Sequence, residues 1–369
     1  YNQLDGTAIL FKNLQLWMGQ PQEARRGFKA IEGELIKKAE EKIASIASTQ
    51  LPTLGETPQE REARENFNRG VEAYENSELN QAIECWTKAI EINPKNAKAY
   101  SNRGVARTDL GDHAGAIADF DKAIEINPKA AQIYFNRGSA RGKSGDYAKA
   151  ISDFDKAIKI NPKDANVYWN RGLARGKSGD HTGAIIDYDK AIEINPKYVE
   201  AYYNRGVTRG KLGDHAGAIA DFDKAIEINP KDAKAYCNRG VARTESGDHA
   251  GAIADYDKAI EIDPKDGNVY YNRGVNREKS GDHARAIDEY NKAIEINPIH
   301  DKAYYNRSCI RAHLKEVDLC AEDLKKAIEL DGKHLEMARR DKDFDGVRGE
   351  AAIEAVLGKA PYEVQGSSK

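Results

Sequence analysis

Histidine and cysteine are the residues of this 369-residue chain that could bind a metal ion. Five histidines are separated by multiples of 34 residues: His113, His181, His215, His249 and His283. Equivalent atoms one period apart cannot share one ion, so we expect these histidines to pack and to bind no metal. The four cysteines show neither metal-site nor disulfide spacing, and Cys309 and Cys320 are interpreted as inert core thiols. Without a nucleophile–base pair or a phosphate-binding loop, we expect no catalysis and no cofactor.

Arginine and acidic residues form a second recurring set. Asn-Arg begins at residues 68, 102, 136, 170, 204, 238, 272 and 306, and we number each 34-residue copy so that this Asn is position 6. A second Arg occupies position 11 in seven copies, and the same seven carry an acid at position 23. The first copy has Ala73 and Cys85 at these positions, so the arginine and the acid are both absent from it. Because a lone buried charge is costly, we expect Arg at position 11 to pair with the acid at position 23.

The elements that position these residues follow from the same period. In the second copy, helix A is expected from Lys98 to Leu110, where Gly111 suits a left-handed turn. Asp112 can cap helix B, which runs to Ile126 and is stopped by Asn127-Pro128. Small residues at positions 8, 20 and 27 let the two helices approach closely. One hairpin cannot bury its own apolar face, so the copies must stack.

The period and its signature residues resemble the tetratricopeptide repeat (TPR). In the second copy these are Gly104, Gly111, Ala116, Phe120, Ala123 and Pro128. The resemblance implies an all-α, right-handed α-α superhelix. It predicts a helical extension and linker over residues 1–62, eight repeats over 63–334, and capping helices with a loose tail over 335–369. Copies rich in "NRG" resemble those of bacterial, cyanobacterial and plastid arrays.

The resemblance also implies that helix A lines a concave groove that binds a partner peptide or helix. A row of position-6 amides could hold an extended backbone, similar to the asparagine ladder of O-linked N-acetylglucosamine transferases. The alternative is that these amides bond between neighbouring helices. The candidate residues are Asn102, Asn136, Asn170, Asn204, Asn238 and Asn272.

The third to fifth copies differ from the rest on this surface. Each has glycine at position 12, followed by Lys143, Lys177 or Lys211. A glycine within a helix costs about 1 kcal/mol relative to alanine, so we expect either a ligand or a neighbouring helix A to approach there. Aromatic residues at position 5 are divided between core and groove: Phe135, Trp169 and Tyr203. Positions 2, 5, 9, 12 and 13 carry eight Lys or Arg against five Asp or Glu, which favours an acidic or extended peptide.

The apolar segment from Asp5 to Gly19 is predicted to be a helix that either caps the array or docks on a partner. No apolar run is long enough to span a membrane, and a net charge of −3 gives no argument for nucleic acid. We therefore expect a non-catalytic interaction scaffold or assembly factor; the resemblance includes relatives that help assemble photosynthetic complexes. The alternative is the sensor or regulatory portion of a larger enzyme or signalling protein, which the start at Tyr1 favours.

Overall fold

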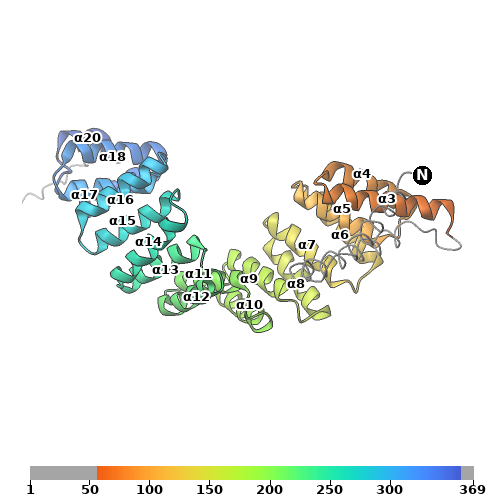
Figure 1. Ribbon diagram of the computed structural model, residues 1–369. Helices are drawn as coiled ribbons and strands as arrows, with labels where there is room; N and C mark the ends of the chain where they lie inside the picture. Colours follow the sequence, from red (N-terminus) through yellow and green to blue (C-terminus); the bar gives the residue numbers. More distant parts are fainter. Residues whose placement is uncertain (1–55, 359–369) are drawn as a thin grey trace, which may run out of the picture. The chain divides into compact units, whose positions relative to one another are not determined.

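The computed structural model describes residues 56–358, and within this range the secondary structure is helical, with no strand. Helices follow one another in antiparallel pairs (Figure 1). This confirms the all-α helical-repeat solenoid expected from the sequence. The predictions for the N-terminal apolar helix and for the C-terminal tail lie outside the described residues.

Each 34-residue copy forms one helical hairpin. The first helices of the hairpins, helices A, are α3 (Pro58–Glu75), α5 (Ala97–Asp109), α7 (Ala131–Lys143), α9 (Ala165–Lys177), α11 (Val199–Lys211), α13 (Ala233–Ser246), α15 (Gly267–Lys279) and α17 (Asp301–His313). The second helices, helices B, are α4 (Leu79–Ile92), α6 (His113–Ile126), α8 (Tyr147–Ile160), α10 (His181–Ile194), α12 (His215–Ile228), α14 (His249–Ile262), α16 (His283–Ile296) and α18 (Val317–Leu330). They are followed by α19 (Lys333–Arg340), the 3-10 helix η2 (Lys342–Phe344) and α20 (Ala351–Leu357).

The turn inside each hairpin is built as the sequence predicts. Gly111 has a φ of +83°, a conformation that glycine adopts without steric cost. Asp112 then caps α6, because its side chain accepts a hydrogen bond of 2.9 Å from the backbone N–H of Gly115. Ser77 and Lys315 take the same left-handed position in the first and last hairpins, with φ of 63° and 60°. The glycine is therefore favoured at this turn but is not indispensable.

The close approach of the two helices depends on a glycine facing an aromatic ring. A Cβ added to Gly172 would lie 2.6 Å from the ring of Tyr188, at position 24 of the same copy. In the last copy the ring is replaced by Leu324 and the glycine by Ser308, and both are fully buried. The two positions thus change together, as packing at crystal-like density requires.

The hairpins fall into two compact units that divide between Pro128 and Lys129. Within each unit, helix B of one hairpin packs on helix A of the next. The units are described separately below.

The predicted ion pair between positions 11 and 23 forms in all seven copies that carry both residues. The N–O distances lie between 2.6 and 3.2 Å. The seven acidic residues are at most 8% exposed, which explains why their carboxylates need partners. In the fifth copy, Arg209 Nη1 lies 2.9 Å from Asp221 Oδ2.

The arginine at position 7 has a role that the sequence analysis missed. Arg205 donates from Nε and Nη2 to Asp221, the same carboxylate that Arg209 contacts, and from Nη1 to Asp189 in α10 of the preceding hairpin. Arg171 and Arg239 make the same link, to Asp155 at 2.5 Å and Asp223 at 2.6 Å. Burial lowers the pKa of the Arg205 guanidinium, but the hydrogen bonds to Asp221 and Asp189 outweigh burial and raise it. The Arg205 side chain therefore links the two helices of its own hairpin and also links that hairpin to the preceding one.

The buried and exposed carboxylates of this network should differ sharply in their contribution to stability. Replacing Asp221 by Ala leaves two arginines without their shared partner, and we expect a loss of about 3 kcal/mol in the free energy of unfolding. Asp223→Ala removes a half-exposed partner of Arg239 and should cost less than about 1 kcal/mol. Urea unfolding followed by circular dichroism measures both. Equal unfolding midpoints for the two variants would contradict the assignment.

Candidate functional site

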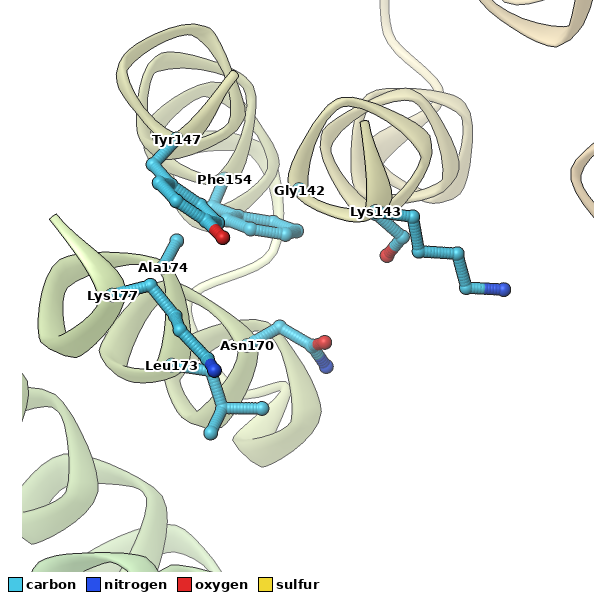
Figure 2. Close-up of a pocket in the computed structure, with 9 residues that line it drawn as sticks. Gly142, Lys143, Tyr147, Phe154, Asn170, Leu173, Ala174 and Lys177 are labelled. Atoms are coloured by element: carbon cyan, nitrogen blue, oxygen red, sulfur yellow. The ribbon is translucent and has the colours of Figure 1, made fainter. Parts of the chain in front are cut away.

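A pocket opens between two neighbouring hairpins of the second unit, on the surface of their helices A. It has a volume of about 250 Å³. Its lining comes from α7, α8 and α9: Ser139, Gly142, Lys143, Tyr147, Phe154, Asn170, Leu173, Ala174 and Lys177. Figure 2 shows the ring of Phe154 reaching toward Gly142, and Asn170 directed into the space between the helices that carry Gly142 and Leu173. The lining combines an apolar floor with polar and cationic side chains at its edge.

An equivalent pocket occurs two hairpins later, between α11, α12 and α13. It has a volume of about 310 Å³, and its lining residues occupy almost the same repeat positions as those of the first pocket. Gly210 and Lys211 correspond to Gly142 and Lys143, and Asn238 corresponds to Asn170. Glu245 takes the place of Lys177, so this second pocket carries both signs of charge.

The glycines at position 12 leave space rather than admit a neighbouring helix. A Cβ added to Gly142, Gly176 or Gly210 would meet only an alanine Cβ of its own hairpin, at 3.8 to 3.9 Å. That is ordinary van der Waals contact, so the chain's own packing does not require these glycines. Of the two alternatives left open by the sequence, close approach of a neighbouring helix A is therefore wrong.

The two helices A that follow close the corresponding space with side chains. In α13 position 12 is Thr244, which is buried and lies 3.2 Å from the hydroxyl oxygen of Tyr256. In α15 it is Glu278, whose carboxylate accepts a hydrogen bond of 2.5 Å from Tyr290. The space beside position 12 is thus open on α7, α9 and α11 and filled by side chains on α13 and α15.

The lysines at position 13 of these three helices carry unneutralised charge. Lys143, Lys177 and Lys211 are exposed, and none of them forms an ion pair with a residue that the structure describes. In α15 the equivalent Lys279 is instead bound to Glu245 of α13, at 2.8 Å. The three lysines at position 13 of α7, α9 and α11 are thus unpaired among the described residues, and each follows a position-12 glycine.

The position-6 amides divide into two groups. On the later helices they bond to the preceding helix A: Asn238 donates to the Tyr203 hydroxyl at 2.8 Å and Asn272 to Cys237 Sγ at 3.4 Å. Asn238 also donates to the Lys234 carbonyl of its own helix at 2.9 Å. On α9 and α11 the amide donates to a carbonyl of its own helix: Asn170 to Asn166 at 2.9 Å and Asn204 to Glu200 at 2.7 Å.

The remaining predicted amides lie in different surroundings. Asn136 on α7 accepts a hydrogen bond of 2.9 Å from Gln132. Asn102 lies half-buried on α5 in the other unit. Bonding between neighbouring helices thus accounts for Asn238 and Asn272, whereas Asn136, Asn170 and Asn204 remain near the open surface.

The position-5 aromatics form the wall behind this surface. Phe135, Trp169 and Tyr203 are half-buried. Their rings lie 5.8 to 5.9 Å from those of Phe154, Tyr198 and Phe222 respectively. Each ring therefore packs partly against the aromatic core, and a role for its exposed part in a groove stays a prediction.

The cysteines are free, and three of them are buried. Burial raises the pKa of Cys237 to about 11 and that of Cys320 to about 12. Both thiols therefore stay protonated at neutral pH and are poor nucleophiles. Within residues 56–358, no helix combines the length and the apolar character needed to cross a bilayer.

Two glycines on α9 provide a direct test of whether position 12 is open or packed. Gly176→Ala adds a methyl group where space exists, so we expect a gain of about 1 kcal/mol in the free energy of unfolding from helix propensity. Gly172→Ala drives its methyl group into the Tyr188 ring and should cost roughly 1–3 kcal/mol. Thermal and urea unfolding measure both changes. Destabilisation by Gly176→Ala as large as that by Gly172→Ala would show that position 12 is packed.

Comparison with known proteins places the chain among helical-repeat proteins. Models described as tetratricopeptide repeat match residues 97–130, 120–152, 199–232, 233–266, 267–300 and 301–334. A model described as TPR repeat matches 70–111, 141–179 and 177–213. Together these matches span residues 70–334 without a gap. None of the curated proteins matches the chain in sequence.

Solved structures agree with the family models. A tetratricopeptide repeat protein from Parabacteroides merdae is 24% identical with a TM-score of 0.52, over 70% of this chain and 99% of that one. The C-terminal part of a TPR repeat-containing protein from Cytophaga hutchinsonii is 20% identical with a TM-score of 0.54, over 64% and 97%. MamA is 28% identical with a TM-score of 0.43, over 45% and 96%.

The first two likenesses show the same fold, and the family models cover most of the chain. Members of this family serve broadly as scaffolds for protein–protein interaction, binding peptides or other proteins. The chain described here belongs to the tetratricopeptide repeat family.

Proposed function

We propose that this chain is a non-catalytic scaffold that holds an extended, acidic segment of a partner protein on the helix-A surface of α7, α9 and α11. One observation carries the proposal: the glycines at position 12 and the unpaired lysines at position 13 occur on the same three helices. Their coincidence beside open pockets indicates a ligand from outside the chain.

The glycines supply the first part of the argument. Each glycine costs about 1 kcal/mol of helix stability relative to alanine. No neighbouring atom of the chain lies close enough to exclude a Cβ at these positions. The stability lost is offset only if something else occupies the space. The pocket between α7 and α9 has room for a small side chain above the Phe154 ring.

The polar groups supply the second part. Asn170 and Asn204 use their N–H donors within their own helices, and their carbonyl oxygens accept no hydrogen bond from a described residue. Each oxygen can therefore accept from a backbone N–H of an extended segment. Lys143, Lys177 and Lys211 can contact carboxylates of that segment, and charge complementarity of this kind favours an acidic partner.

Charge reversal on the two sides of the hairpins tests the proposal. The variant Lys143→Glu, Lys177→Glu and Lys211→Glu should lose a partner that the wild-type chain captures from source-cell extract, as identified by mass spectrometry. The matched control is Lys156→Glu, Lys190→Glu and Lys224→Glu, which makes the same charge change on helices B and should retain the partner. Loss in both variants, or in neither, would contradict binding on the helix-A surface. A captured subunit of a photosynthetic complex would support the assembly role that the sequence resemblance implies.

The amides can be tested separately from the charges. Changing Asn136, Asn170 and Asn204 together to Ala removes the three carbonyl acceptors near the open surface. We expect the same partner to be depleted in affinity purification, while the far-ultraviolet circular dichroism stays unchanged. Asn272→Ala is the comparison, because Asn272 lines neither pocket and its amide donates to Cys237. Unchanged capture by the first variant would exclude an asparagine ladder.

A further inference from the structure

A cluster of metal-ligating side chains lies at the C-terminal end of the second unit, outside the proposed peptide site. It joins Cys309 of α17 to Asp341, the residue before η2, and to Asp343 within η2. The sulfur of Cys309 and one carboxylate oxygen of each aspartate all lie within 4.8 Å of one another. Cys309 is 4% exposed, and both aspartates are half-buried.

A fourth ligand-type group adjoins the three. His313 follows Cys309 by four residues on α17, so both side chains lie on one face of the helix. Its Nε2 is 3.2 Å from Asp343 Oδ1. Both residues depart from the repeat: position 9 is otherwise Val, Leu or Ser, and position 13 is otherwise Lys, Asp or Glu. A Cys–His pair on one helix therefore faces two carboxylates from the loop.

The cluster also lacks the cation that other buried carboxylates of this chain have. Neither Asp341 nor Asp343 forms an ion pair with a Lys or Arg among the described residues; the Asp343 carboxylate contacts the His313 imidazole and the Cys309 thiol. Burial raises the pKa of the nearby Glu278, and the charge of Asp343 adds to this effect. Three acids and a thiol are thus gathered without a fixed positive charge. Tyr305 donates a 2.7 Å hydrogen bond to Asp341 and so orients its carboxylate.

We propose that Cys309, His313, Asp341 and Asp343 form a binding site for a divalent transition-metal ion, with Zn²⁺ as the best match. A thiolate and an imidazole beside carboxylates favour Zn²⁺ over Mg²⁺ and Ca²⁺, which prefer oxygen ligands. Ligand atoms around tetrahedral Zn²⁺ lie about 3.5 Å apart, so Cys309, Asp341 and Asp343 must approach by roughly 1 Å. His313 contacts Asp343 but lies outside the 4.8 Å group, so its side chain must move farther to complete the site.

Metal binding would also change the state of the thiol. Burial, followed by the charges of Asp341 and Asp343, raises the pKa of the Cys309 thiol, so that without a metal ion it is protonated. On binding, the S–H bond breaks, the sulfur–metal bond forms, and the proton leaves to solvent. Each ion bound should therefore release protons, in an amount that depends on pH.

Titration of the full chain with Co²⁺ tests the site, because a thiolate ligand gives a sulfur-to-cobalt charge-transfer absorption. We expect saturation at one equivalent, loss of the band in Cys309→Ser, and retention in Cys320→Ser. The second variant is the matched control, since Cys320 is equally buried in the same hairpin but lies outside the cluster.

His313→Ala provides a variant that is safe for folding, because the side chain is half-exposed. It should weaken Zn²⁺ affinity about tenfold or more in competition with Co²⁺. Absence of the band from the wild-type chain, or an equal band in Cys309→Ser, would overturn the proposal. Wild-type Zn²⁺ affinity in His313→Ala would overturn the four-ligand set.

Discussion

The buried carboxylate at position 23 is the constraint on which the repeat depends. In each hairpin that carries it, this helix-B carboxylate accepts hydrogen bonds from two arginines of helix A, as Asp221 does from Arg205 and Arg209. The first of these arginines also reaches helix B of the preceding hairpin. Because neither sign of charge can be left unpaired in the interior, only one register of the helices satisfies all the groups. The first copy shows the alternative: with Cys85 and Ala73 in place, Arg69 is exposed and bonds only to Asn66 within the described residues.

Because the arginines and acids of this network satisfy one another, other positions are free to differ between copies. Positions 9, 12 and 13 of helix A contribute nothing to the arginine network, so their changes do not disturb the stacking. In α7, α9 and α11 they form open pockets beside free lysines, whereas Thr244 and Glu278 fill the corresponding space in later helices. The side chains at positions that differ between copies are therefore the ones that can provide a binding function.

The regular part of the structure could be predicted from the sequence because its signals recur. Helix A of the second copy was expected at 98–110 and is found at Ala97–Asp109. The pairing of positions 11 and 23 followed from the first copy, which lacks both groups. The link from position 7 to the preceding hairpin was missed, although a signal exists: position 25 is acidic in five copies but is Lys325 in the last, where no further repeat arginine follows. The cluster at Cys309 could not be found in this way, because it depends on a loop outside the period that returns to α17.

The sign of charge along the second unit also restricts where an acidic partner can bind. Position 13 is lysine on α7, α9 and α11 and glutamate on α13. Glu245 is paired with Lys279 of α15, and Glu278 on α15 accepts a hydrogen bond from Tyr290. A carboxylate of the proposed partner would therefore be attracted at the first three helices, over distances comparable with the Debye length of about 8 Å at physiological salt, and would meet no unpaired lysine at position 13 of α13 or α15. In the proposed binding mode, the three unpaired lysines would thus fix the position of the acidic segment along an otherwise repetitive surface.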